Sequence, residues 1–199
     1  MTLQEKDTME YSSLDLSTIR FGEPVAGQKI TSIALQCTDA GPVRLCLGSP
    51  TAPLTSPWHP DTLQQDSAKL NLSLVCPPTL KGLIEALEQK AQESVKLPAK
   101  AVWHSALKQL KSGEWLLRLK LTPPGKPHPV QCWDTCRQTI ELPKDLSGSK
   151  VVPIVTLRHV WFTPLGAGLA LDCTHLMICE SPEAACPFQF DGDSFASLP

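Results

Sequence analysis

The stretch VVPIVTLRHVWFTPLGAGLALDCTHLMI, residues 151–178, decides the fold predicted for this chain. Two long apolar runs flank a short segment rich in Thr, Pro and Gly, which is typical of two strands joined by a turn. Arg158, Trp161 and Phe162 lie just before that turn. Successive residues of a strand point to opposite faces, so only one of the two rings can enter the core. We therefore expect a closing hairpin of a β-domain and ask whether its outer face binds a ligand.

The rest of the chain supports a mainly β fold. Nineteen prolines, about twice the usual frequency, disfavour a helical bundle. In EWLLRLKLT (114–122), Trp115 shares one face with leucines, and Arg118 and Lys120 share the other. Alternation and turn residues predict further strands at 28–37, 42–48, 68–76, 129–134 and 137–142. The fold class that we predict is an OB-fold-like small barrel of short antiparallel strands, mainly β with a helical insert.

The insert interrupts this series of strands. Leu80, Leu83, Ile84 and Leu87 recur at helical spacing, and AVWHSALKQLK (101–111) is expected to form a second, short helix. We predict three parts: a polar lead-in at residues 1–16, an OB-like single-stranded-DNA-binding domain at residues 17–180, and an acidic C-terminal tail at residues 181–199. The helical insert lies within the domain at residues 79–111.

Charge is distributed unevenly along the chain. The formal net charge is −2, yet residues 17–171 contain 17 basic and 11 acidic side chains, a net of +6. Residues 172–199 contain five acids and neither Lys nor Arg. The first 13 residues have no apolar signal-peptide core, and no run of about 18 apolar residues occurs. We expect an intracellular protein without a membrane span, in the nucleus or at a cytoplasmic viral replication site.

Catalytic and metal signatures are absent from the sequence. Phosphate-loop, dinucleotide-binding, zinc-protease and serine-hydrolase motifs do not occur, and the five histidines lie far apart. We expect no enzyme activity and no cofactor. Without secretion the cysteines should be reduced, and Cys37, Cys46 and Cys76 are expected as small buried residues. Cys132 and Cys136 have a CxxxC spacing that is unusual for zinc, so a zinc module is only a third alternative.

Cations follow the predicted strands on the face opposite the leucines. A solvent-exposed sheet face commonly carries charge, but acids are missing from these central positions of the sequence. A cationic face with few carboxylates suits a polyanion, and flat rings can stack on the bases of a single strand. The candidate phosphate-binding residues are Arg44, Arg118, Lys120 and Arg158. The candidate base-stacking residues are Trp58, Trp133 and Trp161, for each of which packing is an equal alternative.

The C-terminal segment FDGDSF combines acids with aromatic rings. Phe190 and Phe195 flank Asp191 and Asp193. Such a tail can bind basic patches on replication proteins, fold back over its own cationic surface, or simply improve solubility.

The order of these pieces resembles the single-stranded DNA-binding-like proteins of large eukaryotic DNA viruses and related algal and protist genomes. The resemblance covers residues 19–178 and is carried by a Pro-rich loop, a Leu-alternating strand, an acidic helix pair and the closing hairpin. It implies an OB-fold that binds single strands without catalysis. Two departures stand out: Gly166-Ala167-Gly168 replaces a Phe-Gly-Leu pattern, and few lysines surround Trp103. Fewer cations imply weaker binding that is lost at a lower salt concentration.

We therefore predict non-catalytic, largely sequence-independent binding of single-stranded DNA in viral replication or recombination. The alternative is a protein-interaction or virion-associated β-module that does not bind nucleic acid. The sequence does not determine the oligomeric state.

Overall fold

The computed structural model of the chain describes residues 8–27, 30–37, 41–60 and 70–180. Its strands are β1 (Thr8–Glu10), β2 (Ile19–Ala26), β3 (Thr31–Cys37), β4 (Gly41–Cys46), β5 (Leu54–Thr55), β6 (Leu70–Val75), β7 (Val102–Trp103), β8 (Leu107–Gln109), β9 (Trp115–Leu121), β10 (Gln131–Trp133), β11 (Thr139–Ile140), β12 (Lys150–Phe162) and β13 (Gly166–Glu180). The helices are α1 (Pro78–Ser94) and the 3-10 turns η2 (Tyr11–Ser13) and η3 (Leu16–Thr18). Within these residues, no helix is long and apolar enough to cross a membrane.

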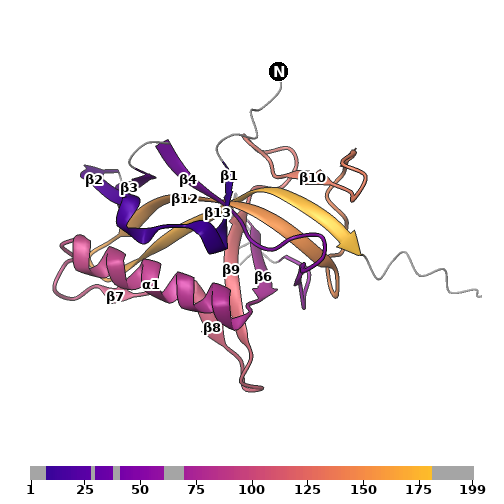
Figure 1. Cartoon of the computed structure of the whole chain (residues 1–199). Helices are drawn as coiled ribbons and strands as arrows, with labels where there is room; N and C mark the ends of the chain where they lie inside the picture. Colours follow the sequence, from indigo (N-terminus) through magenta and orange to yellow (C-terminus); the bar gives the residue numbers. More distant parts are fainter. Residues whose placement is uncertain (1–7, 28–29, 38–40, 61–69, 181–199) are drawn as a thin grey trace, which may run out of the picture.

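The hairpin β12–β13 organises the whole sheet. Its two strands, 13 and 15 residues long, run through the middle of the molecule (Figure 1). β12 pairs with β5 and β4 along its first part and with β3 near its end, while β13 pairs with β10, β9 and β7. Three register irregularities interrupt the ladder between the two long strands. Such bulges bend a strand and increase its twist, which allows one hairpin to serve several short neighbours.

The core lies on the leucine face of this sheet. Leu72, Leu74, Leu117 and Leu119 are completely buried, as the alternation in their strands predicts. α1 covers this face with its apolar stripe, and Leu80, Ile84 and Leu87 are at most 1% exposed. The helix begins with Pro78 at its first turn, where a missing N–H costs nothing. The predicted fold class, mainly β with a helical insert, is therefore confirmed.

The sheet differs from the prediction in the relative direction of its paired strands. We expected short antiparallel strands, whereas β1–β4, β10–β13, β13–β7 and β13–β9 are parallel pairs. The closing hairpin is also much longer than a typical strand pair. The extra length gives both edges of the hairpin room to pair with strands from distant parts of the chain.

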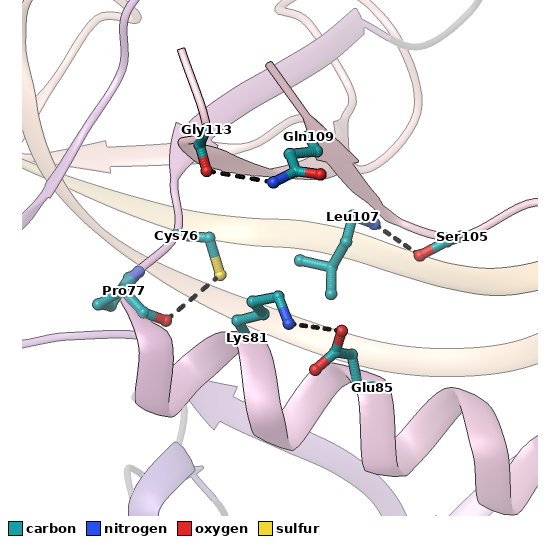
Figure 2. A network of polar contacts seen from close by, with 8 residues as sticks. All are labelled: Cys76, Pro77, Lys81, Glu85, Ser105, Leu107, Gln109 and Gly113. Atoms are coloured by element: carbon teal, nitrogen blue, oxygen red, sulfur yellow. Dashed lines mark hydrogen bonds and ion pairs between the residues drawn. The ribbon is translucent and has the colours of Figure 1, made fainter. Parts of the chain in front are cut away.

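The prediction of a second helix at 101–111 is wrong. This segment forms β7 and β8, which pair with β13 and β9. Leu107 is buried and points from β8 toward α1, and its N–H donates to the Ser105 hydroxyl (Figure 2). Val102 and Ala106 have the spacing of one helical face, which favoured a helix in the prediction. They do not share a buried face, because Val102 is 63% exposed. Pairing with existing strand edges overrides a weak local helical pattern.

The predicted domain limits remain a prediction, although part of the lead-in has regular structure. Thr8–Glu10 pairs with Arg44–Cys46 as β1. Asp15 caps the turn η3 by accepting a hydrogen bond from the Ser17 N–H at 2.8 Å. This bond is the main reason that the pKa of Asp15 is lowered.

Candidate nucleic-acid interface

One row of residues crosses the sheet on the face opposite the core. Arg44 is opposite Thr156, Thr156 is opposite Asp172, Asp172 is opposite Lys120, and Lys120 is opposite Asn71. Residues paired in this way point to the same side of a sheet. Arg44 on β4 and Lys120 on β9 therefore share one face, although they lie far apart in the sequence.

The other two predicted cations lie on the same face. Arg118 precedes Lys120 by two residues on β9, and both are exposed. Arg158 is located at the register irregularity between Leu157 and His159, and its guanidinium lies 3.1 Å from the Asp172 carboxylate. We call the surface formed by Arg44, Arg118, Lys120 and Arg158 the cationic face.

Asp172 corrects the expectation that acids are missing from the centre of this face. It belongs to the middle of β13 rather than to an acidic end, and its side chain is 12% exposed. Arg158 is 58% exposed, so most of its surface faces solvent despite the ion pair. The pair contributes little to stability at such exposure, but it reduces the net charge of the face and restrains the guanidinium.

A pocket of about 210 Å³ opens on the cationic face. Arg118, Lys120 and Trp161, three of the seven predicted binding residues, line it. The remaining lining residues come from β6, β13 and the segment after β7, and they are Asn71, His104, Ser105, Ala106, Leu169 and Leu171. Strand register and side-chain packing therefore bring a predicted ring and two predicted cations to one concave site.

His104 and Trp161 form the aromatic wall of this pocket. Their ring centroids lie 5.9 Å apart and the ring planes differ by 16°. Sequence analysis missed His104 because we assigned it to a helix. The sequence feature that could have indicated a close approach of His104 to this strand was the pair of glycines at 166 and 168. A β-carbon on Gly168 would lie 2.7 Å from the His104 carbonyl oxygen and 3.1 Å from the Trp161 ring.

Trp161 and Phe162 divide between the two faces, as expected for consecutive strand residues. Phe162 packs against the hydrophobic core, whereas Trp161 lines the pocket. Trp115 packs against the core, as predicted, and the Lys81 ammonium lies 4.6 Å from its ring centroid. Lys81 also pairs with Glu85 on the next helical turn (Figure 2).

Trp133 and Trp58 lie outside the pocket. Trp133 ends β10 opposite Met177, two residues after Gln131, which is opposite His175. This register places Trp133 at the other end of the cationic face, half-buried. Trp58 is 49% exposed in the loop after β5, and its carbonyl accepts a hydrogen bond from Ser56. The contacts described for Trp58 do not connect it to the cationic face.

Hydrogen bonds fix the polar side chains of the pocket. Arg118 donates to the Ser105 carbonyl at 2.8 Å, and the Lys120 ammonium donates to the Asn71 side-chain oxygen. Glu88 on α1 is 5% exposed and accepts a hydrogen bond from the Ala106 N–H at 2.7 Å. The helix thereby anchors the segment that contains His104 and Ser105.

The histidine near Arg44 is affected by its surroundings. Burial, and then the Arg44 guanidinium, lower the pKa of His175 from its ordinary value. His175 therefore adds no positive charge to the face at neutral pH.

The cysteines do not converge on a site within the described part of the chain. Cys132 is buried while Cys136 is exposed, and no group of three or more His, Cys, Asp or Glu residues could hold a metal ion among the described residues. Burial raises the pKa of Cys132 to about 11 and also raises the pKa of Cys173. Cys76 is buried as expected, whereas Cys37 and Cys46 are only partly buried.

The tail residues Phe190, Asp191, Asp193 and Phe195 lie outside the described residues, so their role as a partner-binding segment stays a prediction.

No protein-family model and no curated protein sequence matches the chain. The resemblance to proteins of large eukaryotic viruses therefore stays a prediction. Among solved structures, the chain is similar to the single-stranded DNA-binding protein from bacteriophage Enc34, with 11% identity over 86% of this chain and 96% of that chain, and a TM-score of 0.45.

Two further solved structures show comparable similarity. The Enc34 protein in complex with single-stranded DNA has 12% identity over 78% of this chain and 93% of that chain, with a TM-score of 0.45. The gp2.5 single-stranded DNA-binding protein of bacteriophage T7 has 14% identity over 70% of this chain and 94% of that chain, with a TM-score of 0.43. At these scores the similarity does not determine function, which has to be argued from the cationic face.

Proposed function

We propose that this protein binds single-stranded DNA on its cationic face, without catalysis and with little overall dependence on sequence. The observation that carries the proposal is the pocket in which Arg118 and Lys120 lie beside the stacked rings of Trp161 and His104. Phosphate-binding cations next to an accessible ring form the combination that single-strand binding requires, and Trp161 is partly exposed.

The proposed roles follow from the chemistry of each side chain. Arg44, Arg118, Lys120 and Arg158 bind phosphates along the row that crosses the sheet, and Arg158 divides its donors between Asp172 and the strand. Trp161, whose ring stacks with His104, also stacks on one base. Trp133 offers a second ring at the other end of the face. Base stacking by Trp58 remains a prediction that no described contact supports.

The small volume of the pocket favours an unpaired base over a base pair as its occupant. A stacked base must be unpaired to lie flat on Trp161, and a volume of about 210 Å³ is smaller than a typical drug-sized site. One unstacked base is an occupant of the right size. Strand handling during replication or recombination of DNA is the process that we propose for this activity.

Fluorescence anisotropy across a salt series tests the proposal. The probe is an oligo(dT) of about 30 nucleotides, longer than the sites of roughly 4–16 nucleotides that single OB-folds cover. We expect saturable binding whose logarithmic affinity falls linearly with the logarithm of salt concentration. A blunt duplex of the same length is the control, and it should bind more weakly. A weak signal that does not change with salt would end the proposal and favour a protein-interaction module.

A further inference from the structure

We propose that the pocket beside Trp161 discriminates between bases and prefers keto bases, namely thymine, uracil and guanine, over the amino bases cytosine and adenine. This inference rests on the proposed binding of single strands and specifies which base the pocket accepts. It goes beyond the proposed function, because a face that is otherwise indifferent to sequence would read one nucleotide.

The orientation of the Asn71 amide supports this preference. Its side chain is buried, with 9% exposure, and its amide oxygen accepts a hydrogen bond from the Lys120 ammonium. An ammonium group can only donate, so the oxygen must face Lys120 and the amide NH₂ must point elsewhere. Asn71 lines the pocket, and the contacts of the described residues assign no acceptor to its NH₂, so we infer that this group donates to an occupant.

Hydrogen-bond donors outnumber acceptors among the side chains around the pocket. Among the described residues, its polar lining consists of Asn71, His104, Ser105, Arg118 and Lys120 and includes no carboxylate. Arg118 and Lys120 have no acceptor atom, and the acceptor of Asn71 is engaged. The Ser105 hydroxyl already accepts a hydrogen bond from the Leu107 N–H at 3.0 Å. An occupant therefore meets mainly N–H groups.

Keto and amino bases both carry ring acceptors, so the preference applies to the orientation that we propose, in which the exocyclic group of the base faces the Asn71 NH₂. Thymine presents O4 and guanine presents O6 as acceptors, whereas cytosine and adenine present an NH₂ group at the equivalent position. An NH₂ directed at Asn71 would place donor against donor and leave the buried Asn71 NH₂ unpaired. One such mismatch corresponds to roughly a tenfold difference in affinity.

Abasic oligonucleotides with a single base provide the test. In a backbone of about 15 nucleotides, every sugar is abasic except a central one, which carries uracil, cytosine, hypoxanthine or adenine. Uracil and cytosine form one keto–amino pair of equal ring size, and hypoxanthine and adenine form the other. By anisotropy, we expect each keto base to bind roughly tenfold more tightly than its amino partner.

Asn71→Asp identifies the residue responsible. The carboxylate still accepts from Lys120 but has no NH₂ to donate, so the keto preference should disappear or reverse. Gln131→Glu is the matched control, because it adds the same charge on β10, opposite His175 and outside the pocket. It should weaken all four probes equally and keep the preference.

The outcomes separate this inference from the proposed function. Equal affinity for keto and amino bases in a protein that binds oligo(dT) would overturn the inference alone. A keto preference that survives in folded Asn71→Asp would also overturn it, because a group other than the Asn71 amide would then discriminate between the bases. If that variant does not fold, the ratio measured with the native protein decides. Failure to bind oligo(dT) at all would remove both proposals.

Discussion

The imidazole of His104 lies parallel to the indole of Trp161, with ring centroids 5.9 Å apart. The two residues come from different parts of the sheet, since His104 follows β7 and Trp161 is near the end of β12. The His104 N–H donates to the Ala167 carbonyl at 2.7 Å, and Trp161 is opposite Gly168, so β13 holds both rings. The stack is thus built on the backbone of a single strand.

Replacing Trp161 should weaken single-strand binding. Base–aromatic stacking contributes about 1–3 kcal/mol per base, so Trp161→Leu is expected to reduce oligo(dT) affinity by roughly 5- to 150-fold. Trp161→Phe keeps a ring and should retain part of the affinity. Trp58→Leu is the comparison, because this exposed ring lies in the loop after β5 and should matter less. A folded Trp161→Leu protein with native affinity would exclude stacking on this ring.

Gly168→Ala tests whether the positions of the His104 and Trp161 rings depend on the absence of a side chain at residue 168. The added methyl would lie 2.7 Å from the His104 carbonyl and 3.1 Å from the Trp161 ring, so one of them must move. We expect weaker oligo(dT) binding and a changed tryptophan emission spectrum. Gly82→Ala is the control: a β-carbon there meets nothing within 4 Å, and the change in α1 should stabilise the protein by up to about 1 kcal/mol. Native binding and emission in Gly168→Ala would show that the rings do not depend on the glycine.

The strands and the core could be predicted from the sequence because alternation depends on neighbouring residues alone. The closing hairpin, the split between Trp161 and Phe162, and the apolar stripe of α1 all follow from local periodicity. Arg44, Arg118 and Lys120 were also identified, since each lies between apolar residues of a strand.

The parts that sequence analysis missed depend on contacts between distant segments. The stretch 101–111 has a helical spacing, but it forms strands that pair with β9 and β13. This pairing places the His104 ring against the Trp161 ring. Asp172 looked like part of an acidic end until β13 placed it opposite Lys120. No pattern in a single segment reveals such pairings.

Glu88 should be more important for stability than a typical helical glutamate. Glu88→Ala would leave the buried Ala106 N–H without an acceptor, which costs about 1–3 kcal/mol. Glu88→Gln retains an acceptor oxygen and should cost less. Glu85→Ala is the control, because this half-exposed residue only pairs with Lys81 and should change stability by less than about 1 kcal/mol. Urea unfolding measures all three, and equal losses for Glu88→Ala and Glu85→Ala would contradict the role of this bond.

Mild acid should destabilise the fold through His175. Burial and Arg44 lower its pKa in the folded protein below the ordinary value of 6.5. The unfolded chain then binds more protons as the pH falls through this region, so the free energy of unfolding decreases below about pH 7. Urea unfolding at about pH 7.5 and pH 5.5 should show this decrease, and His175→Gln should reduce it. His128→Gln, in an exposed loop, should leave the decrease unchanged. A native pH dependence in His175→Gln would contradict the assignment.

The cationic face itself is tested most directly by the salt dependence of a double variant. Arg118→Ala with Lys120→Ala removes two phosphate-binding groups, so oligo(dT) affinity should fall and the slope of log affinity against log salt should decrease by about one to two counter-ions. Lys90→Ala with Lys96→Ala removes the same charge at and just beyond the C-terminal end of α1, away from the pocket, and should keep the native slope. If the folded Arg118/Lys120 variant binds with the native affinity and the native slope, the strand does not cross this face.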